Sequence, residues 1–294
     1  MTSLPFISCK IMGGLGNQLF QIFTTIAYSF RQKISFIFPY MLQLDEKRHS
    51  YWNSFLADLY KNTTINPEWR MNNNHLVSIP TYHETVFQFQ EIPKVKISFK
   101  LLGYFQSYKY FAEEQESIFK LIHLREQQQI ILHEFQYLFN DLENVTYISL
   151  HFRLGDYILL QEYHPIISLE YYKKSIDYIL SFLSSFRKIK IVFFCEKNDN
   201  VIVSDKINKL KSIFREENIE FIKVKDEIPD WKQLLIMSIC HHNIIANSTF
   251  SWWGAYFNMN PHKLVCYPSS WFGVKKQNVI LDDLFPDTWK KIQC

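Results

Sequence analysis

The fold is decided by the stretch VTYISLHFRLGDY, residues 145–157. Its first half is rich in β-branched and aromatic side chains, which predicts a buried strand. The strand runs into His151 and Arg153, and we expect these side chains to have partners because an unpaired buried charge is costly. Ligands of open α/β sheets lie at the carboxyl ends of strands, and a guanidinium is suited to phosphate. Two interpretations stay open at this point: a phosphate-binding strand end, or a structural ion pair between Arg153 and Asp156.

The N-terminal part of the chain predicts a β-loop-α-β unit. A strand is expected over 5–12, a helix from Leu19 to Phe30 and a second strand over 34–38, which together indicate a parallel sheet. The loop 13–18 reads GGLGNQ and holds three of the 7 glycines of the chain. It fits neither the dinucleotide fingerprint nor a P-loop. Its glycines let backbone N–H groups approach an anion at a helix N-terminus, although a plain tight turn would also explain them.

The remaining segments alternate between strand and helix patterns. Helices are expected over 51–60, 111–141, 169–182, 206–217, 231–240 and 281–292, and strands over 95–101, 189–194, 219–224, 244–246 and 264–267. Residues 62–80 are expected to form a surface loop. The helix over 111–141 has no Gly or Pro and leads into the key strand, so we place a domain boundary at residue 142.

Composition narrows the class of protein. The chain has 294 residues, 47% of them apolar, which is enough for two domains with real cores. A net charge of +3 is too balanced to indicate a nucleic-acid-binding protein. The five cysteines contain no C-x-x-C pair, which favours a reducing compartment and argues against a disulfide scaffold or a zinc site.

A membrane anchor has to be considered because residues 11–30 carry no charge. Three glycines and the side chains of Asn17, Gln18 and Gln21 dilute its hydropathy below that of spanning helices. We therefore expect no membrane span and no signal peptide, and a soluble, cytoplasmic protein.

A polar loop enters a helix at residues 247–251, which read NSTFS. Ser248 or Thr249 would serve as an N-cap. One cap needs one residue, and this loop has more polar groups than capping requires. The same hydroxyl and N–H groups would also suit a phosphate or a ribose.

Three segments together resemble the α-1,2-fucosyltransferase family of inverting, GDP-fucose-dependent glycosyltransferases. They are GGLGNQ at 13–18, HFRLGDY at 151–157 and NIIANSTFSWWGAY at 243–256, and GYFQS at 103–107 matches as well. The matches run in order over about the whole chain.

The resemblance implies an α/β fold of the GT-B type, with two Rossmann-like domains facing across a cleft. The acceptor side would be residues 1–142 and the GDP-sugar side residues 143–294. The activity implied is transfer of L-fucose from GDP-β-L-fucose to the 2-hydroxyl of a terminal sugar, commonly galactose, with inversion. No metal and no cofactor are implied, so protein donors must meet the charge of the leaving GDP.

Site residues follow from the same resemblance. Arg153 is the expected catalytic charge partner of the leaving group, and Asp156 is one candidate for the general base, with a purely structural carboxylate as the alternative. The expected donor-binding residues are His151, Arg153, Gly14, Gly16, Asn17, Ser248, Thr249, Phe250 and Ser251. Tyr104 and Gln106 are the expected acceptor-binding residues.

The chain departs from the family pattern at two places. Leu154 stands where the family has a second arginine, which indicates either a buried position or an altered donor or activity. The segment Cys195-Glu196-Lys197 replaces a Ser-Asp-Asp segment, and leaves Glu196, Asp226 and Asp230 as candidates for ribose and base contacts. A GT-B enzyme for another GDP-sugar and a non-catalytic glycan- or nucleotide-binding relative remain as alternatives. Neither a nucleic-acid partner nor a defined oligomeric state is implied.

Overall fold

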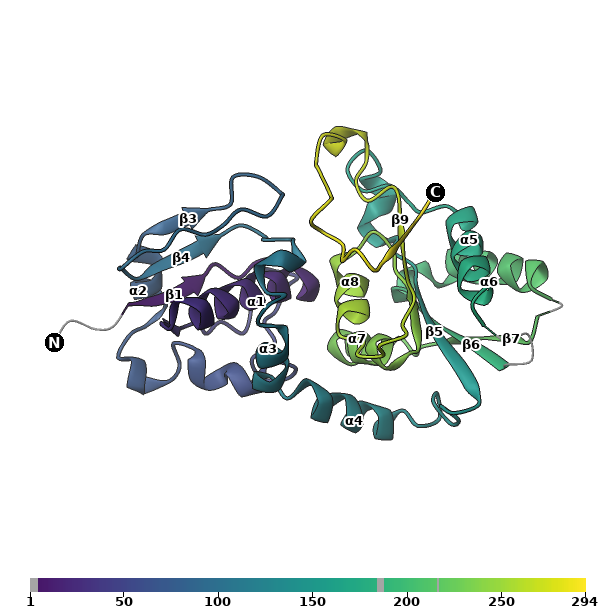
Figure 1. Cartoon of the computed structure of the whole chain (residues 1–294), viewed down its shortest axis with the longest axis horizontal. Coiled ribbons are helices and arrows are strands. Elements are labelled where there is room, and N and C mark those ends of the chain that lie inside the picture. Colours follow the sequence, from purple (N-terminus) through teal and green to yellow (C-terminus); the bar gives the residue numbers. More distant parts are fainter. Residues whose placement is uncertain (1–4, 184–187, 216) are drawn as a thin grey trace. The chain divides into compact units, whose positions relative to one another are not determined.

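The computed structural model describes residues 5–183, 188–215 and 217–294, and the chain divides into two compact units (Figure 1). Unit 1 comprises Met1–Arg125 and Ile280–Pro286, and unit 2 comprises Glu126–Val279 and Asp287–Cys294. Each unit is built on a parallel β-sheet that carries helices. The expected α/β class with two sheets is therefore confirmed.

The sheet of unit 1 has the strand order β2-β1-β4-β3, and all neighbouring strands are parallel. The strands are β1 (Phe6–Cys9), β2 (Ser35–Phe36), β3 (Thr81–His83) and β4 (Phe99–Leu102). Helix α1 (Leu15–Gln32) connects β1 to β2, and its residues from Leu15 to Ser29 are almost all buried. Because α1 follows β1 through the glycine-rich loop, its N-terminus lies at the carboxyl end of β1.

The other elements of unit 1 are short. They are the helices α2 (Asn73–Ser78) and α3 (Gln115–Leu121) and the 3₁₀ turns η1 (Ala57–Asn62), η2 (Pro67–Trp69) and η3 (Tyr108–Tyr110). The helix expected over 51–60 was wrong: the chain makes successive turns there, and buried aromatic side chains rather than a helical face produced the apolar pattern. The loop expected over 62–80 contains α2, whose first turn is capped by the Asn72 side chain accepting from the N–H of His75.

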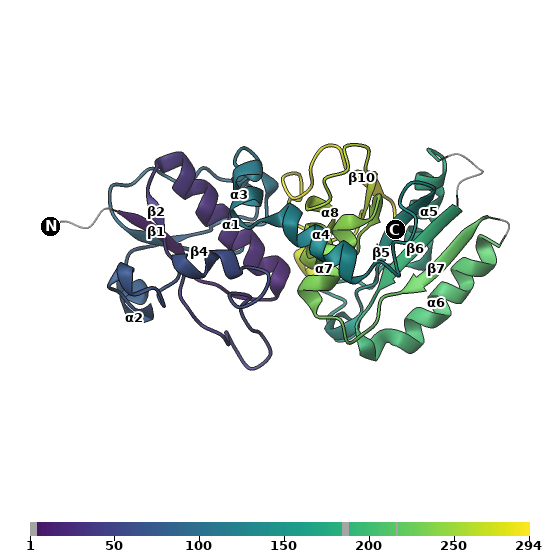
Figure 2. The ribbon, with the colours of Figure 1, turned by 90° about the horizontal axis from the view of Figure 1, so that it is seen from below.

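Unit 2 contains a larger parallel sheet in the order β10-β9-β8-β5-β6-β7 (Figures 1 and 2). The strands are β5 (Val145–His151), β6 (Lys188–Phe194), β7 (Ile219–Lys223), β8 (His242–Ile244), β9 (Val265–Pro268) and β10 (Lys290–Ile292). Strand β5 is buried along its whole length and pairs with β6 on one side and β8 on the other. The stretch that decided the fold is thus a central strand of this sheet.

Helices lie on both faces of this sheet (Figure 1). One face carries α5 (Leu169–Leu180) and α6 (Asn200–Ile213), whose apolar residues join those of β5 and β6 in one core cluster. The opposite face carries α7 (Asp230–Ile239) and α8 (Thr249–Tyr256). Helix α4 (Leu124–Glu134) and the 3₁₀ turns η4 (Gly155–Leu159), η5 (Lys197–Asp199) and η6 (Val274–Lys276) complete the unit.

Two expectations about the connections need correction. The long helix expected over 111–141 is interrupted at His123, whose φ of 49° is left-handed and ends α3. Residues from 126 onward belong to unit 2, before the expected boundary at 142. The buried Gln128 ties α4 to this unit, donating from Nε2 to Ser238 Oγ at 2.8 Å and to the Phe257 carbonyl at 3.1 Å.

The helix expected over 281–292 was also wrong. Asp283 belongs to unit 1, where its carboxylate pairs with Lys109 and accepts from the N–H of Phe89. The chain then returns to unit 2 and adds β10 to the edge of the sheet. The segment therefore consists of turns followed by the short strand β10 (Lys290–Ile292) rather than a helix.

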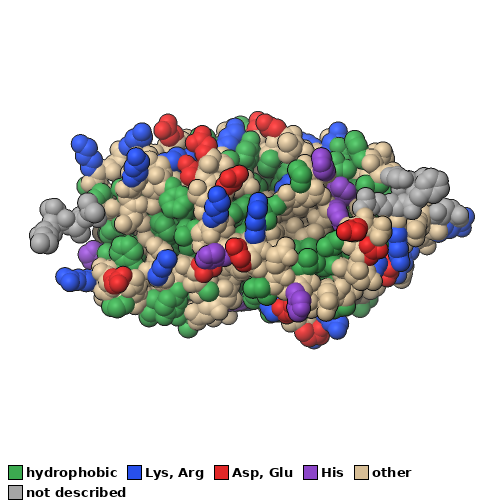
Figure 3. Space-filling view, turned by 60° about the horizontal axis from the view of Figure 1, so that its bottom comes forward, with side chains coloured by type: hydrophobic (Ala, Val, Ile, Leu, Met, Phe, Trp, Pro, Cys, Tyr) green, Lys and Arg blue, Asp and Glu red, His purple; other side chains and the backbone are tan. Residues whose placement is uncertain are grey.

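None of the helices in the described ranges combines the length and the apolar character needed to cross a membrane. Charged side chains of both signs are interspersed on the face shown in Figure 3, in line with the small net charge.

Candidate active site

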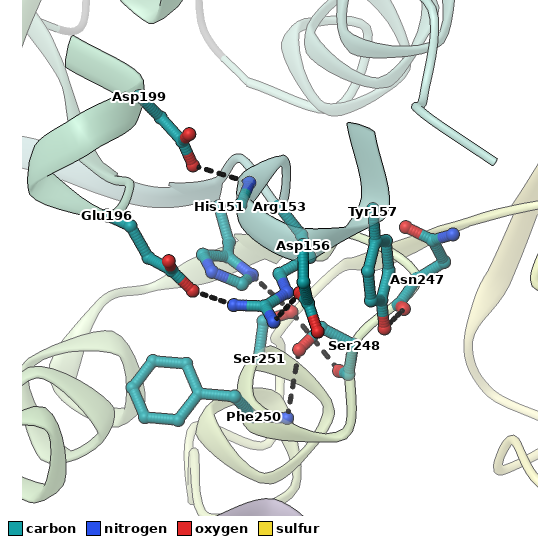
Figure 4. Close-up of polar contacts among 11 residues, drawn as sticks. His151, Arg153, Asp156, Tyr157, Glu196, Asp199, Asn247, Ser248, Phe250 and Ser251 are labelled. Atoms are coloured by element: carbon teal, nitrogen blue, oxygen red, sulfur yellow. Dashed lines mark hydrogen bonds and ion pairs between the residues drawn. The ribbon is translucent and has the colours of Figure 1, made fainter. Parts of the chain in front are cut away.

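Arg153 lies just past the carboxyl end of β5, between two carboxylates (Figure 4). Its Nη2 donates to Asp156 Oδ1 at 2.5 Å, and its Nη1 donates to Glu196 Oε1, which follows the neighbouring strand β6. The guanidinium carbon also lies 4.9 Å from the ring centre of Tyr157. The ion pair with Asp156 that the sequence suggested therefore exists, and Glu196 adds a second carboxylate to it.

Gly155 brings the loop after β5 against the loop after β6. Its φ of 41° is left-handed, and a Cβ at this position would lie 2.8 Å from Glu196 Oε2. Its N–H donates to Oδ2 of the buried Asp199 at 2.9 Å. Only glycine satisfies both the backbone conformation and the close approach, so this residue helps to set where Arg153 and Glu196 meet.

His151 is buried at the end of β5 and joins it to helix α8. Its Nδ1 lies 2.9 Å from Ser251 Oγ, and its ring centre lies 5.6 Å from that of Phe250. Burial, and secondarily the nearby Arg153 charge, lowers the pKa of His151 to about 3. The imidazole is therefore neutral near pH 7 and contributes hydrogen bonding rather than positive charge.

The loop before α8 is held by its own polar groups. Ser248 is the N-cap, and its Oγ accepts from the N–H of Phe250 at 3.3 Å. Asn247 donates from Nδ2 to the carbonyl of Pro165 at 2.9 Å. Thr249 is the first residue of α8. Capping thus accounts for Ser248, while Ser251 is directed at His151.

Tyr157 connects the Arg153 cluster, formed by Arg153, Asp156 and Glu196, to the loop before α8. Its hydroxyl donates to the carbonyl of Asn247 at 3.2 Å, and its ring stacks on that of His164 with centres 4.6 Å apart. The sequence interpretation assigned Tyr157 and Asp199 no role. Their signal was present in the sequence, because polar residues that follow adjacent parallel strands meet at one edge of the sheet.

Leu154 is buried, with 3% of its surface exposed, and belongs to the core cluster beneath α5 and α6. Of the two interpretations of this departure from the family pattern, the buried position is the one that the structure supports.

Unit 1 brings other expected residues together. Gln106 donates from Nε2 to Asn17 Oδ1 at 2.9 Å, which joins the turn after β4 to the first turn of α1. Glu84 accepts from the N–H groups of Tyr104 and Phe105 at 2.7 and 2.9 Å. Phe105 has a left-handed φ of 53°, a conformation that bulky residues rarely adopt. Glu84, which the sequence interpretation missed, thus stabilises the turn that presents Gln106.

The glycines of the loop before α1 have distinct positions. Gly13 has a left-handed φ of 81°, Gly14 is the N-cap of α1, and Gly16 is buried within its first turn. Tyr104 is 41% exposed. Gly14 and Tyr104 are therefore at least partly exposed, whereas Gly16 is buried.

Within residues 5–183, 188–215 and 217–294, no three His, Cys, Asp or Glu side chains are arranged to hold a metal ion. His241 and His242, adjacent in the sequence, accept separate backbone bonds from Tyr147 and Leu264.

Comparison with known proteins places these residues in a family. A family model described as glycosyl transferase family 11 matches residues 6–270. The chain belongs to glycosyl transferase family 11. The resemblance drawn from the sequence motifs is thereby confirmed at the level of the family, and the Arg153 cluster, the α8 loop and the Asn17–Gln106 pair all lie inside the matched range.

Two curated relatives, both from Escherichia coli, are similar to the chain. An O-antigen biosynthesis glycosyltransferase, WbnK, is 30% identical over 64% of this chain and 61% of its own length. An alpha-1,2-colitosyltransferase is 25% identical over 99% of this chain and 100% of its own length. Among solved structures, the fucosyltransferase NodZ from Bradyrhizobium aligns with a TM-score of 0.45 at 12% identity, over 86% of this chain and 92% of that chain.

Proposed function

We propose that this family 11 glycosyltransferase moves L-fucose from GDP-β-L-fucose to the 2-hydroxyl of a terminal sugar, with galactose as the first choice of acceptor. The reaction proceeds with inversion and without a metal ion. The observation that carries the proposal is the position of Arg153 at the carboxyl end of β5, beside the first turn of α8, where Ser251 contacts His151 (Figure 4). This edge of a parallel sheet is where α/β proteins bind nucleotides.

Arg153 meets the charge of the departing diphosphate in this proposal. Its present partners, Asp156 and Glu196, both have side chains that are 52% exposed. Ion pairs of such exposure contribute only about 0–1 kcal/mol. A diphosphate offers more charge and several acceptor oxygens, so replacing one of these carboxylates by a phosphate costs the protein little.

The reacting hydroxyl group of the acceptor sugar must pass its proton to a base, unless the transition state is loose and the proton leaves late. We assign the role of general base to Asp156, whose carboxylate is half exposed and held by Arg153 through one oxygen. Glu196 has the same exposure and the same partner, so it is the direct competitor for this role.

The remaining site residues fall into two groups. His151, the N-cap Ser248 and the first-turn residues Thr249, Phe250 and Ser251 of α8 bind the nucleotide part of the donor. Gly14 and Asn17 of unit 1 bind its sugar-phosphate part, and Gly16, which the sequence also suggested for this role, is buried. Tyr104 and Gln106 contact the acceptor, since an aromatic face and an amide suit a sugar.

The experiment is a donor panel with product analysis. The purified protein is incubated with GDP-fucose and an acceptor ending in galactose, with and without EDTA, and the linkage of the product is determined by NMR. An α-1,2-linked fucoside formed at the same rate in EDTA is the expected result. Transfer from a different GDP-sugar alone, or complete loss of transfer in EDTA, would refute this assignment. Tight GDP binding by calorimetry with no turnover on any acceptor would instead indicate a non-catalytic relative.

A colitosyl donor is the second candidate, because the alpha-1,2-colitosyltransferase aligns with nearly the whole chain. Colitose is L-fucose without its 3-hydroxyl group. A site that hydrogen-bonds this hydroxyl rejects the deoxy sugar by about 10⁴–10⁵ in kcat/KM, whereas a site with an apolar wall discriminates by about 10²-fold or less. The ratio of kcat/KM for the two GDP-sugars therefore separates the candidates.

A further inference from the structure

Arg48 lies against the glycine-rich loop of unit 1, although nothing in the sequence pattern drew attention to it. A Cβ built on Gly14 would lie 2.7 Å from Arg48 Nη1. The backbone of Gly14 is extended, with φ −74° and ψ 175°, so its conformation does not require glycine. The absence of a side chain at residue 14 instead leaves room for the guanidinium beside the loop.

Gln18 explains why Arg48 lies there. This side chain is 1% exposed, and its Nε2 donates both to the carbonyl of Gly13 and to the carbonyl of His49, each at 2.9 Å. One buried amide thus ties the loop to the hairpin 42–50, which is closed by a bridge between Gln43 and His49. The residue next to His49 is therefore held at the loop.

Several polar groups around Arg48 have no hydrogen-bond partner within the described parts of the chain. Within the described parts of the chain, no hydrogen bond or ion pair occupies the guanidinium of Arg48. The N-cap of α1 makes no side-chain cap, and its first turn contains no acidic residue. Gln18 Oε1 is buried without a partner, on the same amide that clamps the loop.

The guanidinium of Arg48 and the N-terminus of α1 together favour a negatively charged ligand at the glycine-rich loop. A guanidinium beside the N-terminus of an 18-residue helix attracts an anion. A sugar phosphate carries this negative charge, and the clamp made by Gln18 keeps the hairpin that bears Arg48 beside the loop.

We propose that Arg48, positioned by Gln18, binds a phosphate of the sugar-nucleotide donor on the glycine-rich loop of unit 1. The inference rests on the proposed function, because that function supplies a diphosphate-linked sugar as the ligand. Arg48 touches the donor, and Gln18 acts through the hairpin.

The test compares Arg48→Ala, Arg48→Lys and Gly14→Ala in the full chain, with kcat and the KM values for GDP-fucose and acceptor measured separately. Loss of a hydrogen bond to a charged group corresponds to about 10- to 100-fold in affinity. We expect Arg48→Ala to raise the donor KM by about that factor and leave the acceptor KM unchanged. Arg48→Lys should recover part of the lost donor affinity, since lysine keeps the positive charge but lacks the paired N–H donors of the guanidinium.

Gly14→Ala should shift the guanidinium away from the loop and raise the donor KM in the same direction. When Gly14→Ala is added to Arg48→Ala, it should cause little further increase in the donor KM, because both changes remove the same contact between Arg48 and the donor. Lys47→Ala is the matched control: it removes an equal charge from the neighbouring exposed position of the same hairpin and should leave the donor KM unchanged. Calorimetry with GDP-fucose measures the same effect without turnover.

An Arg48→Ala variant with the wild-type donor KM and donor affinity would overturn the inference while leaving the proposed function intact. An equal effect of Lys47→Ala would also overturn it, because it would indicate general charge attraction. Wild-type protein that binds no GDP-sugar would overturn the proposed function and this inference together.

Discussion

Gln106 Nε2 lies 2.9 Å from Asn17 Oδ1, and this bond joins two segments 89 residues apart in the sequence. One partner belongs to the glycine-rich loop region and the other to the turn after β4. We predict that Asn17→Ala and Gln106→Ala each lower kcat/KM by about 2- to 10-fold, the range of one neutral hydrogen bond. The double variant should lower kcat/KM by less than the product of the two single reductions, because the two side chains bond to each other. Fully independent effects in a four-variant kinetic cycle would show that the bond has no role in the site.

Arg153→Ala should lower kcat by about 10²–10³, because it removes a preorganised charge partner of the leaving group. The unfolding free energy should change by no more than about 1 kcal/mol, since both carboxylate partners are half exposed. Transfer assays and urea unfolding check the two expectations. Arg125→Ala removes an exposed arginine elsewhere and serves as the control. A variant that is destabilised but turns over normally would indicate a purely structural ion pair.

Asp156→Asn and Glu196→Gln separate the two carboxylates on Arg153. Removal of a general base lowers kcat by about 10²–10⁴. We predict this loss for Asp156→Asn and a smaller change, mainly in donor KM, for Glu196→Gln, which removes the negative charge paired with Nη1 of Arg153. The reverse order of effects would transfer the role of base to Glu196, and similar small effects would indicate a reaction without one.

Leu154→Arg restores the arginine of the family pattern, yet we predict a loss of stability. The leucine is 3% exposed in a packed core, and a charged side chain there has no hydration. A decrease on the order of 3 kcal/mol in the free energy of unfolding is expected. Leu159→Arg, at a position that is 88% exposed, is the control and should leave stability unchanged. A gain in kcat with unchanged stability would mean that the departure from the pattern reduced activity.

Stability should fall as the pH is lowered from about 6.5 toward 3, partly through His151. Its folded pKa of about 3 lies below the unfolded value of 6.5, so between these limits the unfolded chain binds one more proton than the folded one. One such proton changes the unfolding free energy by about 1.4 kcal/mol per pH unit. In urea unfolding measured from pH 4 to 7, the slope of the unfolding free energy against pH should be smaller by this amount in His151→Asn than in the wild type. The exposed His262→Asn should keep the wild-type slope; an unchanged slope in His151→Asn would show that this imidazole is protonated in the folded state.

The local sequence was sufficient to predict features that depend on a single strand or a single loop. Strand β5 was predicted almost to the residue because a fully buried strand is a continuous run of apolar and β-branched residues. The α8 loop was predicted because Ser248 has the chemistry of an N-cap. The buried side chain of Leu154 was one of two interpretations that the sequence left open.

Residues that act through distant partners were missed. Glu84 stabilises a turn 20 residues further along the chain, and nothing near it in the sequence indicates that role. Arg48 belongs to a polar hairpin whose pattern is that of an exposed loop. The segment 281–292 has the periodicity of a helix, but it forms turns and a short strand, because its first part bonds to Ser107 and its last part pairs with β9.

The sequence by itself determined the α/β class, from its alternating strand and helix patterns, and the strand end that carries His151 and Arg153, because both are written in residues that are neighbours in the chain. It also determined membership of glycosyl transferase family 11, because short motifs occur in order along the chain. Only the tertiary structure decided that Arg153 is shared by Asp156 and Glu196, that Leu154 is core, and that Arg48 lies on the glycine-rich loop. These relationships arise where separate strands end at one sheet edge or where one buried amide joins two loops, and no local pattern encodes which loops will meet.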